Sequence, residues 1–343
     1  MHHSKGFLTL VLVPLPVSVA VLTPATSANL GPGFDTLGLA LQLYNRFDVE
    51  IIDGDPGTPQ IEVQGQLGDK LSKGPDNLFF QAFALLFQRK QVELPAVKIR
   101  MSISIPPGCG LGSSATAVVG GLVAANELLR KRGLGVPKEE LLAPAVESEA
   151  GNHPDNVAPA LLGGLVATTT AGGEIRAVKT RFPDALKAII FTPSFPMDTV
   201  TGRKLLPAEY SRKDVTFNTG RVALFLTALQ TGHYELIGEA MQDRLHQPYR
   251  QTLFPAMPDI IQAALDAGAY GASLSGGGSS LIALASTDFQ AILRAMRETA
   301  RSAGVDGTGM ILRADQVGAR VIATSRSKKR KQSNYDFPSN ALH

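Results

Sequence analysis

Apolar and polar residues alternate strictly over residues 97–105, where every second side chain is apolar. This two-residue period is typical of a strand with one buried face, and it marks the clearest strand of the chain. Residues 47–52 alternate in the same way, and the apolar run 17–22 predicts an earlier strand. Between residues 77 and 91 the apolar positions recur every three or four residues, which indicates an amphipathic helix.

The same periods predict the remaining elements. Helices are expected at residues 115–132, 141–150, 218–229, 235–243, 260–267 and 289–303, and strands at 61–63, 188–192, 309–312 and on both sides of a glycine turn within 271–285. Strands and helices follow one another irregularly, without the strict alternation of parallel sheets, so we expect an α+β fold.

The chain of 343 residues suggests two domains of ordinary size or one large one. The composition changes over residues 171–184, so we predict a first domain at residues 17–170 and a second at 171–324. Residues 1–16 then form an N-terminal extension. The tail at residues 325–343 is polar and basic, which predicts disorder.

Positive charge is concentrated at the C-terminal end. The formal net charge is +3, and residues 325–343 carry five basic side chains against one acidic, so the rest of the chain is almost neutral. The body therefore has no basic partner surface. The chain also contains no tryptophan, which removes one source of aromatic platforms for single-stranded nucleic acid. Residues 328–331 match a nuclear signal or nucleic-acid patch only in composition, and we expect no nucleic-acid partner.

An apolar run at residues 6–22 superficially resembles a signal peptide. Pro14 and Pro16 interrupt it, and it is short for a membrane span. We therefore expect no membrane segment and a cytoplasmic location. The single cysteine, Cys109, excludes an intramolecular disulfide and a multi-cysteine metal site, and it fits a reducing compartment.

A glycine-rich loop follows the clearest strand and precedes the helix predicted from residue 115. Glycines let backbone N–H groups approach an anion, and a helix start adds further N–H groups and the positive end of the macrodipole. A glycine turn capped by a serine is common, but this longer string is more specific, and it is neither a Walker A loop nor a dinucleotide fingerprint. The candidate phosphate-binding residues are Pro106, Pro107, Gly108, Cys109, Gly110, Leu111, Gly112, Ser113 and Ser114.

Residues 106–115 resemble the second signature motif of the galactokinase–homoserine kinase–mevalonate kinase (GHMP) superfamily. Residues 24–35 resemble the first motif in the form found in the homoserine kinase family. Residues 273–280 resemble the third motif, with Ser279 where a proline is usual. The resemblance implies a two-domain GHMP kinase fold: an N-terminal β-α-β domain with a left-handed crossover, and a ferredoxin-like C-terminal domain.

The resemblance implies an enzyme that uses ATP and Mg²⁺ to phosphorylate the side-chain hydroxyl of L-homoserine, a step of threonine biosynthesis. In the family, the serine at the position of Ser114 helps to bind Mg²⁺, together with a glutamate shortly before residues 153–156. Two glutamates fit that description; we favour Glu149 and keep Glu147 as the alternative. Asn77 resembles a segment near the adenine pocket, or it is a helix N-cap.

Asn156 stands where mevalonate kinase-like relatives place an aspartate as catalytic base. An amide cannot take a proton, so the resemblance implies that the hydroxyl proton passes directly to a phosphate oxygen. In matching family segments Arg203 and Arg250 would hold the substrate carboxylate by charge-assisted hydrogen bonds, and we count Arg203 with Asn156 as catalytic. The other residues expected around the substrate are Asn29 and Asp35, for its ammonium and hydroxyl end, and His153.

Two alternatives stay open from the sequence. One is another superfamily kinase, acting on mevalonate, shikimate or a sugar. The other is a non-catalytic nucleotide-binding protein of the same fold, which should have lost a metal ligand or the phosphate loop. His233 and His246 lack motif support, so we interpret them as structural, and Cys109 as a small filler. The resemblance also implies a homodimer.

Overall fold

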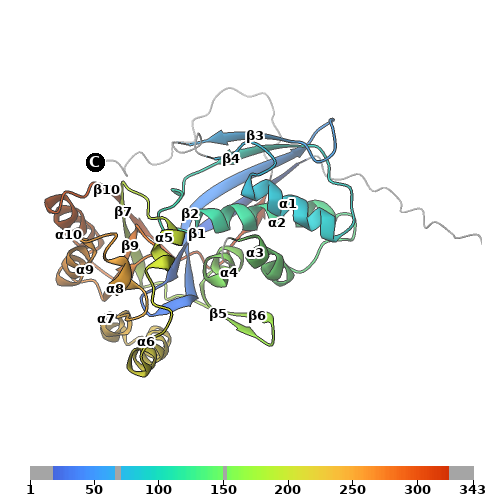
Figure 1. The fold of residues 1–343 in the computed structure, drawn as a ribbon. Helices are drawn as coiled ribbons and strands as arrows, with labels where there is room; N and C mark the ends of the chain where they lie inside the picture. Colours follow the sequence, from blue (N-terminus) through green and yellow to red (C-terminus); the bar gives the residue numbers. More distant parts are fainter. Residues whose placement is uncertain (1–17, 66–70, 150–152, 324–343) are drawn as a thin grey trace, which may run out of the picture.

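The computed structural model describes residues 18–65, 71–149 and 153–323. The predicted extension at residues 1–16 and the predicted tail at 325–343 lie outside the described residues. The chain forms two sheets that lie side by side, each with its own helices (Figure 1). The predicted α+β class is confirmed.

The first sheet has seven strands in the order β11-β1-β2-β4-β3, with β5 beside β2 and β6 beside β5. Its strands are β1 (Ser18–Asn29), β2 (Gly33–Ile51), β3 (Pro59–Gln64), β4 (Val97–Ser102), β5 (Leu165–Ala171), β6 (Glu174–Thr180) and β11 (Arg320–Ile322). Strands β3 and β4 are parallel, and α1 (Leu78–Arg89) connects them. They form the β-α-β unit that the family resemblance implies. Of the strand predicted at residues 97–105, the first six residues form β4, with Val97, Ile99 and Met101 buried, and residues 103–105 belong to the loop that follows.

Helices α1, α2 (Ser113–Arg130), α3 (Leu142–Ser148) and α4 (Pro154–Leu162) lie on one side of this sheet (Figure 1). A short 3₁₀ turn (Lys138–Leu141) precedes α3. The rings of Phe47 and Phe79 stack in the core with centroids 4.7 Å apart. Gly120 permits this packing, because a Cβ atom there would lie 2.7 Å from the ring of Phe47. Burial of such a side chain contributes about 1.5–3 kcal/mol.

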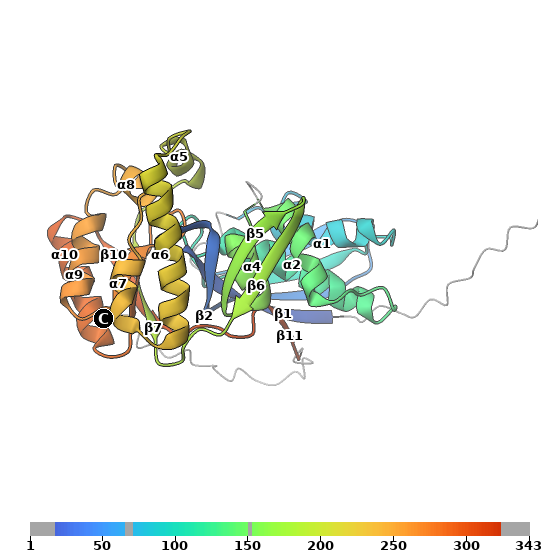
Figure 2. The ribbon, with the colours of Figure 1, turned by 90° about the horizontal axis from the view of Figure 1, so that it is seen from below.

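The second sheet has the order β10-β7-β9-β8, and all its neighbours are antiparallel. Its strands are β7 (Lys187–Pro193), β8 (Gly271–Leu274), β9 (Leu281–Ala285) and β10 (Gly307–Leu312). Helices lie between β7 and β8 and between β9 and β10, so the connectivity is the ferredoxin-like one that the resemblance implies. These helices are α5 (Thr199–Lys204), α6 (Arg212–Thr231), α7 (Ile237–Ala240), α8 (Gln247–Arg250), α9 (Met257–Asp266) and α10 (Phe289–Ser302) (Figure 2).

The predicted division between residues 170 and 171 cuts through β5. The β5–β6 hairpin continues the first sheet to Thr180, and β11 returns from the second sheet to pair with β1. We therefore propose that the first domain extends to about residue 181 and also takes in β11. The composition changes within this hairpin, and for this reason a boundary predicted from composition falls inside it.

Several predicted helices need adjustment. The helix predicted at residues 115–132 begins at Ser113, and the one predicted at 235–243 is a 3₁₀ turn (Tyr234–Leu236) followed by α7. The last part of the latter segment instead forms a loop around Asp243, whose carboxylate accepts hydrogen bonds from three following backbone N–H groups. Within the described ranges, none of the helices has the length and apolar character needed to cross a membrane.

Candidate functional site

A cavity of about 480 Å³ lies between the two sheets. Its walls come from the β1–β2 turn, the start of α1, the loop before α2, the start of α4, α5, and the turn between β8 and β9. All three motif segments line this cavity: the first through Asn29 and Asp35, the second through residues of the glycine-rich loop, and the third through Gly276 and Gly277. The predicted site residues that line it are Asn29, Asp35, Asn77, Pro107, Gly108, Gly110, Gly112, Ser113, Ser114, Glu149, His153, Asn156, Arg203 and Arg250.

The glycine-rich loop ends at an open helix start. Gly112 is the N-cap of α2, with φ of 68°, and it supplies no side-chain hydrogen bond to the helix. The first N–H groups of α2 therefore have no intrahelical acceptor, and they are available to an anion. A Cβ atom at Gly112 would lie 1.9 Å from Thr26 Oγ1, so only glycine fits there.

The turn between β8 and β9 holds this loop in place. Ser275 Oγ donates to the Gly110 carbonyl at 2.6 Å, and Ser280 N donates to the Cys109 carbonyl at 3.0 Å. A Cβ atom at Gly110 would lie 2.2 Å from the Ser275 carbonyl oxygen. The third motif therefore fixes the backbone of the second, although the two are far apart in sequence.

Three predicted loop residues do not line the cavity. Leu111 is fully buried in the core. Cys109 is buried, and its thiol donates to the Pro107 carbonyl at 3.5 Å, in agreement with a filling role. Pro106 also lies outside the lining.

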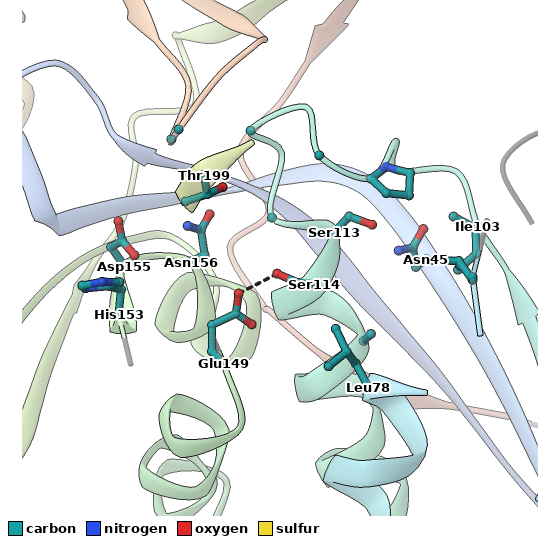
Figure 3. A pocket seen from close by; sticks show the side chains of 18 of the residues that line it. Asn45, Leu78, Ile103, Ser113, Ser114, Glu149, His153, Asp155, Asn156 and Thr199 are labelled. Carbon is teal, nitrogen blue, oxygen red and sulfur yellow. Dashed lines mark hydrogen bonds between the residues drawn. The ribbon is translucent and has the colours of Figure 1, made fainter. Parts of the chain in front are cut away.

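The two candidate metal-binding glutamates lie in different surroundings. Ser114 Oγ donates to Glu149 Oε1 at 2.5 Å inside the cavity (Figure 3). Glu149 Oε2 is buried and has no hydrogen-bond partner among the described residues. Burial raises the pKa of Glu149, and the Ser114 hydroxyl opposes this. Glu147 is instead exposed and forms an ion pair with Arg89.

This donor set suits a magnesium ion. Mg²⁺ takes hard oxygen ligands, and in kinases it is held by one or two carboxylates plus substrate phosphates. The carboxylate oxygen without a partner beside a hydroxyl is such a set, and a cation there would relieve the cost of burying Glu149. Within residues 18–65, 71–149 and 153–323 no group of three or more histidine, cysteine or acidic side chains is positioned to hold a metal ion, so an all-protein metal cage is absent from that part of the chain.

Asn156 and Asn77 both have their oxygen atoms occupied. Thr26 Oγ1 donates to Asn156 Oδ1 at 2.8 Å, which leaves the amide nitrogen as the group that can face a ligand. Asn77 caps α1, because its Oδ1 accepts from Phe79 N at 3.0 Å and from Phe80 N. It also lines the cavity, so the cap and a place beside a ligand are compatible.

The residues expected to hold the two charges of the substrate are paired with each other. Arg203 donates to both carboxylate oxygens of Asp35, at 3.0 and 2.5 Å. His153 Nδ1 lies 3.4 Å from Asp35 Oδ2, and burial lowers the pKa of His153. Asn29 Oδ1 accepts the Asp35 backbone N–H at 3.0 Å. The ion pair of Asp35 with Arg203 therefore bridges the two halves of the molecule across the cavity.

Arg250 is buried, with 1% of its surface exposed. Its Nη1 donates to the Gly276 carbonyl at 3.2 Å and contacts His246 Nδ1 at 3.0 Å. Its Nε is buried without a hydrogen-bond partner in the described part of the chain. Burial lowers the pKa of Arg250, and the neighbouring charge of Arg203 acts in the same direction. The cavity therefore has two guanidinium groups near one another, an arrangement that suits a carboxylate.

Asp155 is a cavity residue that sequence reasoning did not single out. It is 4% exposed, and burial raises its pKa to about 7, with the nearby charge of Asp35 adding to the effect. Its only sequence signal was its place beside Asn156. Asn45 also escaped notice: its Oδ1 accepts from Ser104 N and Ile105 N, so it positions the entry to the glycine-rich loop.

Comparison with known proteins agrees with this geometry. The family "GHMP kinases N terminal domain" matches residues 77–164, and "GHMP kinases C terminal" matches residues 225–302. The chain is 41% identical over 303 residues to the homoserine kinase of Parasynechococcus marenigrum (strain WH8102), covering 88% of this chain and 95% of that protein. It is 43% identical over 305 residues to the homoserine kinase of Microchaete diplosiphon, covering 88% and 96%.

Solved structures give the same result. The crystal structure of homoserine kinase from Cytophaga hutchinsonii matches with a TM-score of 0.82 and 31% identity, covering 92% of this chain and 100% of that one. The mevalonate kinase of L. major in complex with R-mevalonate matches with a TM-score of 0.65 and 21% identity, covering 87% and 95%. At that identity the second match shows a shared fold and nothing more about the acceptor.

Proposed function

Because the chain belongs to the homoserine kinase family of GHMP kinases, we propose that it transfers the γ-phosphate of ATP to the hydroxyl of L-homoserine, giving O-phospho-L-homoserine and ADP. One observation carries the proposal. A single cavity has an open helix start with Ser114 and Glu149 in one part, and the charged set of Asp35, Arg203 and Arg250 in another. The first part suits a nucleotide phosphate chain, and the second suits a zwitterionic amino acid.

At the nucleotide end, the N–H groups at the start of α2 bind phosphate oxygens, and the fixed loop keeps them pointed at the ligand. Ser114 and Glu149 would hold Mg²⁺, and the bound ion would supply positive charge that offsets the negative charge of the phosphates. Asn77 stands on the same side as Leu78 and Met101, whose side chains provide apolar surface for the base.

At the acceptor end, the substrate replaces an existing ion pair. The ammonium group takes the place of the Arg203 guanidinium beside Asp35, and the substrate carboxylate takes Arg203 together with Arg250. Each charge thus exchanges one partner for another, so no charge is left unpaired in the cavity. A neutral alcohol could not make this exchange, and this favours an amino acid over a sugar. Mevalonate has a carboxylate but no ammonium group for Asp35.

The transfer itself needs positioning more than proton abstraction. Asn156, oriented by Thr26, donates from its amide nitrogen to the hydroxyl oxygen of the acceptor. That oxygen forms a bond to the γ-phosphorus while the bond from phosphorus to the β-phosphate oxygen breaks. The hydroxyl proton goes to an oxygen of the transferred phosphate, so no side chain has to accept it.

The test is a coupled assay of ADP formation with ATP, Mg²⁺ and a panel of alcohols. We expect turnover with L-homoserine, with O-phospho-L-homoserine identified by mass spectrometry. Turnover with mevalonate and none with L-homoserine would overturn the proposal in favour of another superfamily kinase. ATP binding with no turnover on any acceptor would favour the non-catalytic alternative.

We further propose that the enzyme works in the cytoplasm as a homodimer. The single cysteine fits a reducing compartment, and the family resemblance supports the dimer. Light scattering coupled to gel filtration checks the second point, with an expected mass twice the 36.3 kDa of one chain. A mass of one chain across the working concentrations would contradict it.

A further inference from the structure

We propose that His246 is a positioning residue for the acceptor: it fixes the Arg250 guanidinium so that its remaining N–H groups face the substrate carboxylate. The inference rests on the proposed function. His246 does not line the cavity, and it acts only through Arg250.

The two nitrogens of the buried imidazole contact different parts of the molecule. His246 has no exposed surface. Its Nε2 lies 2.7 Å from the Gly31 carbonyl oxygen, in the turn that carries the first motif. Its Nδ1 lies 3.0 Å from Arg250 Nη1, one turn further along the chain. The ring therefore links the β1–β2 turn of one sheet to the arginine of the other half of the molecule.

These partners define which nitrogen carries the hydrogen. A carbonyl oxygen only accepts, so Nε2 must donate to Gly31; a guanidinium only donates, so Nδ1 must accept from Arg250. Nη1 of Arg250 has two hydrogens, and the second goes to the Gly276 carbonyl at 3.2 Å. With Nη1 fully used, Nε and Nη2 are the groups left for a ligand. The neutral Nε2–H tautomer of His246 thus determines how Arg250 is presented.

The surroundings keep the ring neutral and in place. Burial lowers the pKa of His246, and the Arg250 charge acts in the same direction, against Asp243, Asp35 and the Gly31 carbonyl. Phe34 stacks on the imidazole with ring centroids 5.2 Å apart. The same phenylalanine lies under both guanidinium groups, 5.2 Å from Arg203 and 5.5 Å from Arg250. A protonated imidazole would add a further positive charge beside Arg250 and Arg203, which is costly in this buried place.

Two substitutions separate the two hydrogen bonds of the ring. In His246→Asn the amide oxygen can reach the position of Nδ1, which keeps an acceptor for Arg250 and loses the link to Gly31. In His246→Gln the amide can reach the position of Nε2, which keeps the donor to Gly31 and loses the acceptor for Arg250. A purely structural histidine would make the two variants equivalent for the substrate.

We expect His246→Gln to raise the KM for L-homoserine about tenfold, which corresponds to about 1.4 kcal/mol, with the KM for ATP unchanged. His246→Asn should raise the KM for L-homoserine less than about threefold, which is the effect expected when one hydrogen bond is only weakened. His233→Asn, at an exposed histidine outside the cavity, is the control and should match the unaltered protein. Equal homoserine KM values for the Asn and Gln variants, or parallel changes in the KM for ATP, would overturn the inference.

A second measurement needs no variant to fold. The ¹⁵N chemical shifts of the imidazole in the unaltered protein report the tautomer, and we expect His246 as the neutral Nε2–H form at neutral pH. The Nδ1–H form or the cation would overturn the inference. Absence of homoserine-dependent turnover in the unaltered protein would instead overturn the proposed function, and the two failures are therefore distinct.

Discussion

Glu147 and Glu149 are two residues apart, yet only the second reaches Ser114. We expect Glu149→Gln to lower kcat/KM by roughly 10²–10³, comparable to the loss of one group that stabilises transition-state charge, and to raise the Mg²⁺ concentration needed for half-maximal rate. Steady-state rates over a Mg²⁺ series measure both effects.

The matched control is Glu147→Gln. It removes a carboxylate of the same size from the exposed pair with Arg89, and exposed pairs contribute about 0–1 kcal/mol. Rates and Mg²⁺ dependence should therefore stay unchanged. If the Glu147 variant lost activity and the Glu149 variant kept it, the assignment of the metal site would be reversed.

Asp155 should make stability depend on pH. Its pKa in the folded protein is about 7, above the ordinary 3.8, mainly because of burial. Between these pH values the folded state keeps a proton that the unfolded state releases, so the free energy of unfolding falls as pH rises. Asp155→Asn removes this loss of unfolding free energy. The loss can reach about 4 kcal/mol, because one unit of pKa difference corresponds to about 1.36 kcal/mol.

Thermal unfolding of both proteins without ligand, from pH 4 to pH 8, measures the effect. We expect the Tm advantage of Asp155→Asn to grow between about pH 4 and pH 7 and then to level off, since Asp155 is ionised in both states above that range. A Tm difference that stayed constant across the series would show that the carboxyl does not titrate as its burial requires.

The chemical types at the site could be predicted from the sequence, but their pairing could not. The family resemblance implied Ser114 and one of two glutamates, with Glu149 favoured over Glu147, and the structure places Ser114 and Glu149 in contact. The ion pair of Asp35 with Arg203 joins residues 168 positions apart, and no local pattern encodes such a contact. The interpretation of His246 as structural rests on its lack of motif support, and its contact with Gly31, 215 positions away, is likewise not encoded by a local pattern.

At the scale of elements, the glycine-rich loop depends on close backbone contact. Gly110 and Gly133 have nearly the same backbone conformation, with φ of 75° and 71°. A Cβ atom at Gly110 would lie 2.2 Å from the Ser275 carbonyl oxygen, whereas none at Gly133 would meet an atom within 4 Å among the described residues. Alanine at residue 133 would therefore introduce backbone strain alone, whereas alanine at residue 110 would add a steric overlap.

We expect both Gly110→Ala and Gly133→Ala to lose about 1–2 kcal/mol through the left-handed conformation. Only Gly110→Ala should displace the loop, raising the KM for ATP at least about tenfold, or 1.4 kcal/mol. Denaturant unfolding and ATP titration of the rate measure the two effects. An unchanged KM for ATP in Gly110→Ala would show that the loop does not bind the nucleotide.

Helices and strands whose apolar residues recur with a clear period could be predicted from the sequence. Strands that form mainly because a neighbouring strand offers an edge could not. Most of the predicted ranges 97–105 and 289–303 form β4 and α10, because each has an apolar face of its own. Strand β6 is mostly exposed and alternates only over its first residues, and β11 has three residues, so neither has an apolar face long enough to predict a strand. They are strands because β5 and β1 offer free edges, which is a tertiary effect.

At the scale of the whole molecule, the final segment returns from the second sheet to the first, and Asp315 anchors it. Its carboxylate, 2% exposed, accepts hydrogen bonds from the Tyr44 hydroxyl at 2.7 Å and from Arg320 at 3.0 Å. Its backbone pairs with Ala40 and Gly164. The cavity lies between the two sheets, so this connection helps to hold the two sheets in a fixed relative position on either side of it.

Asp315→Ala should therefore destabilise the molecule by about 1–3 kcal/mol, the cost of leaving donors such as the Gly318 N–H and the Tyr44 hydroxyl without their acceptor, and a lower midpoint of denaturant unfolding measures it. Because the loss loosens one wall of the cavity against the other, the KM values for both substrates should rise together, unlike the selective change expected for His246→Gln. Deletion of residues 325–343 is the control, since it removes none of the described strands or helices. Its midpoint and turnover should equal those of the full chain. A large loss of turnover on deletion, with Asp315→Ala near normal, would mean that the tail and not the β11 return holds the active arrangement.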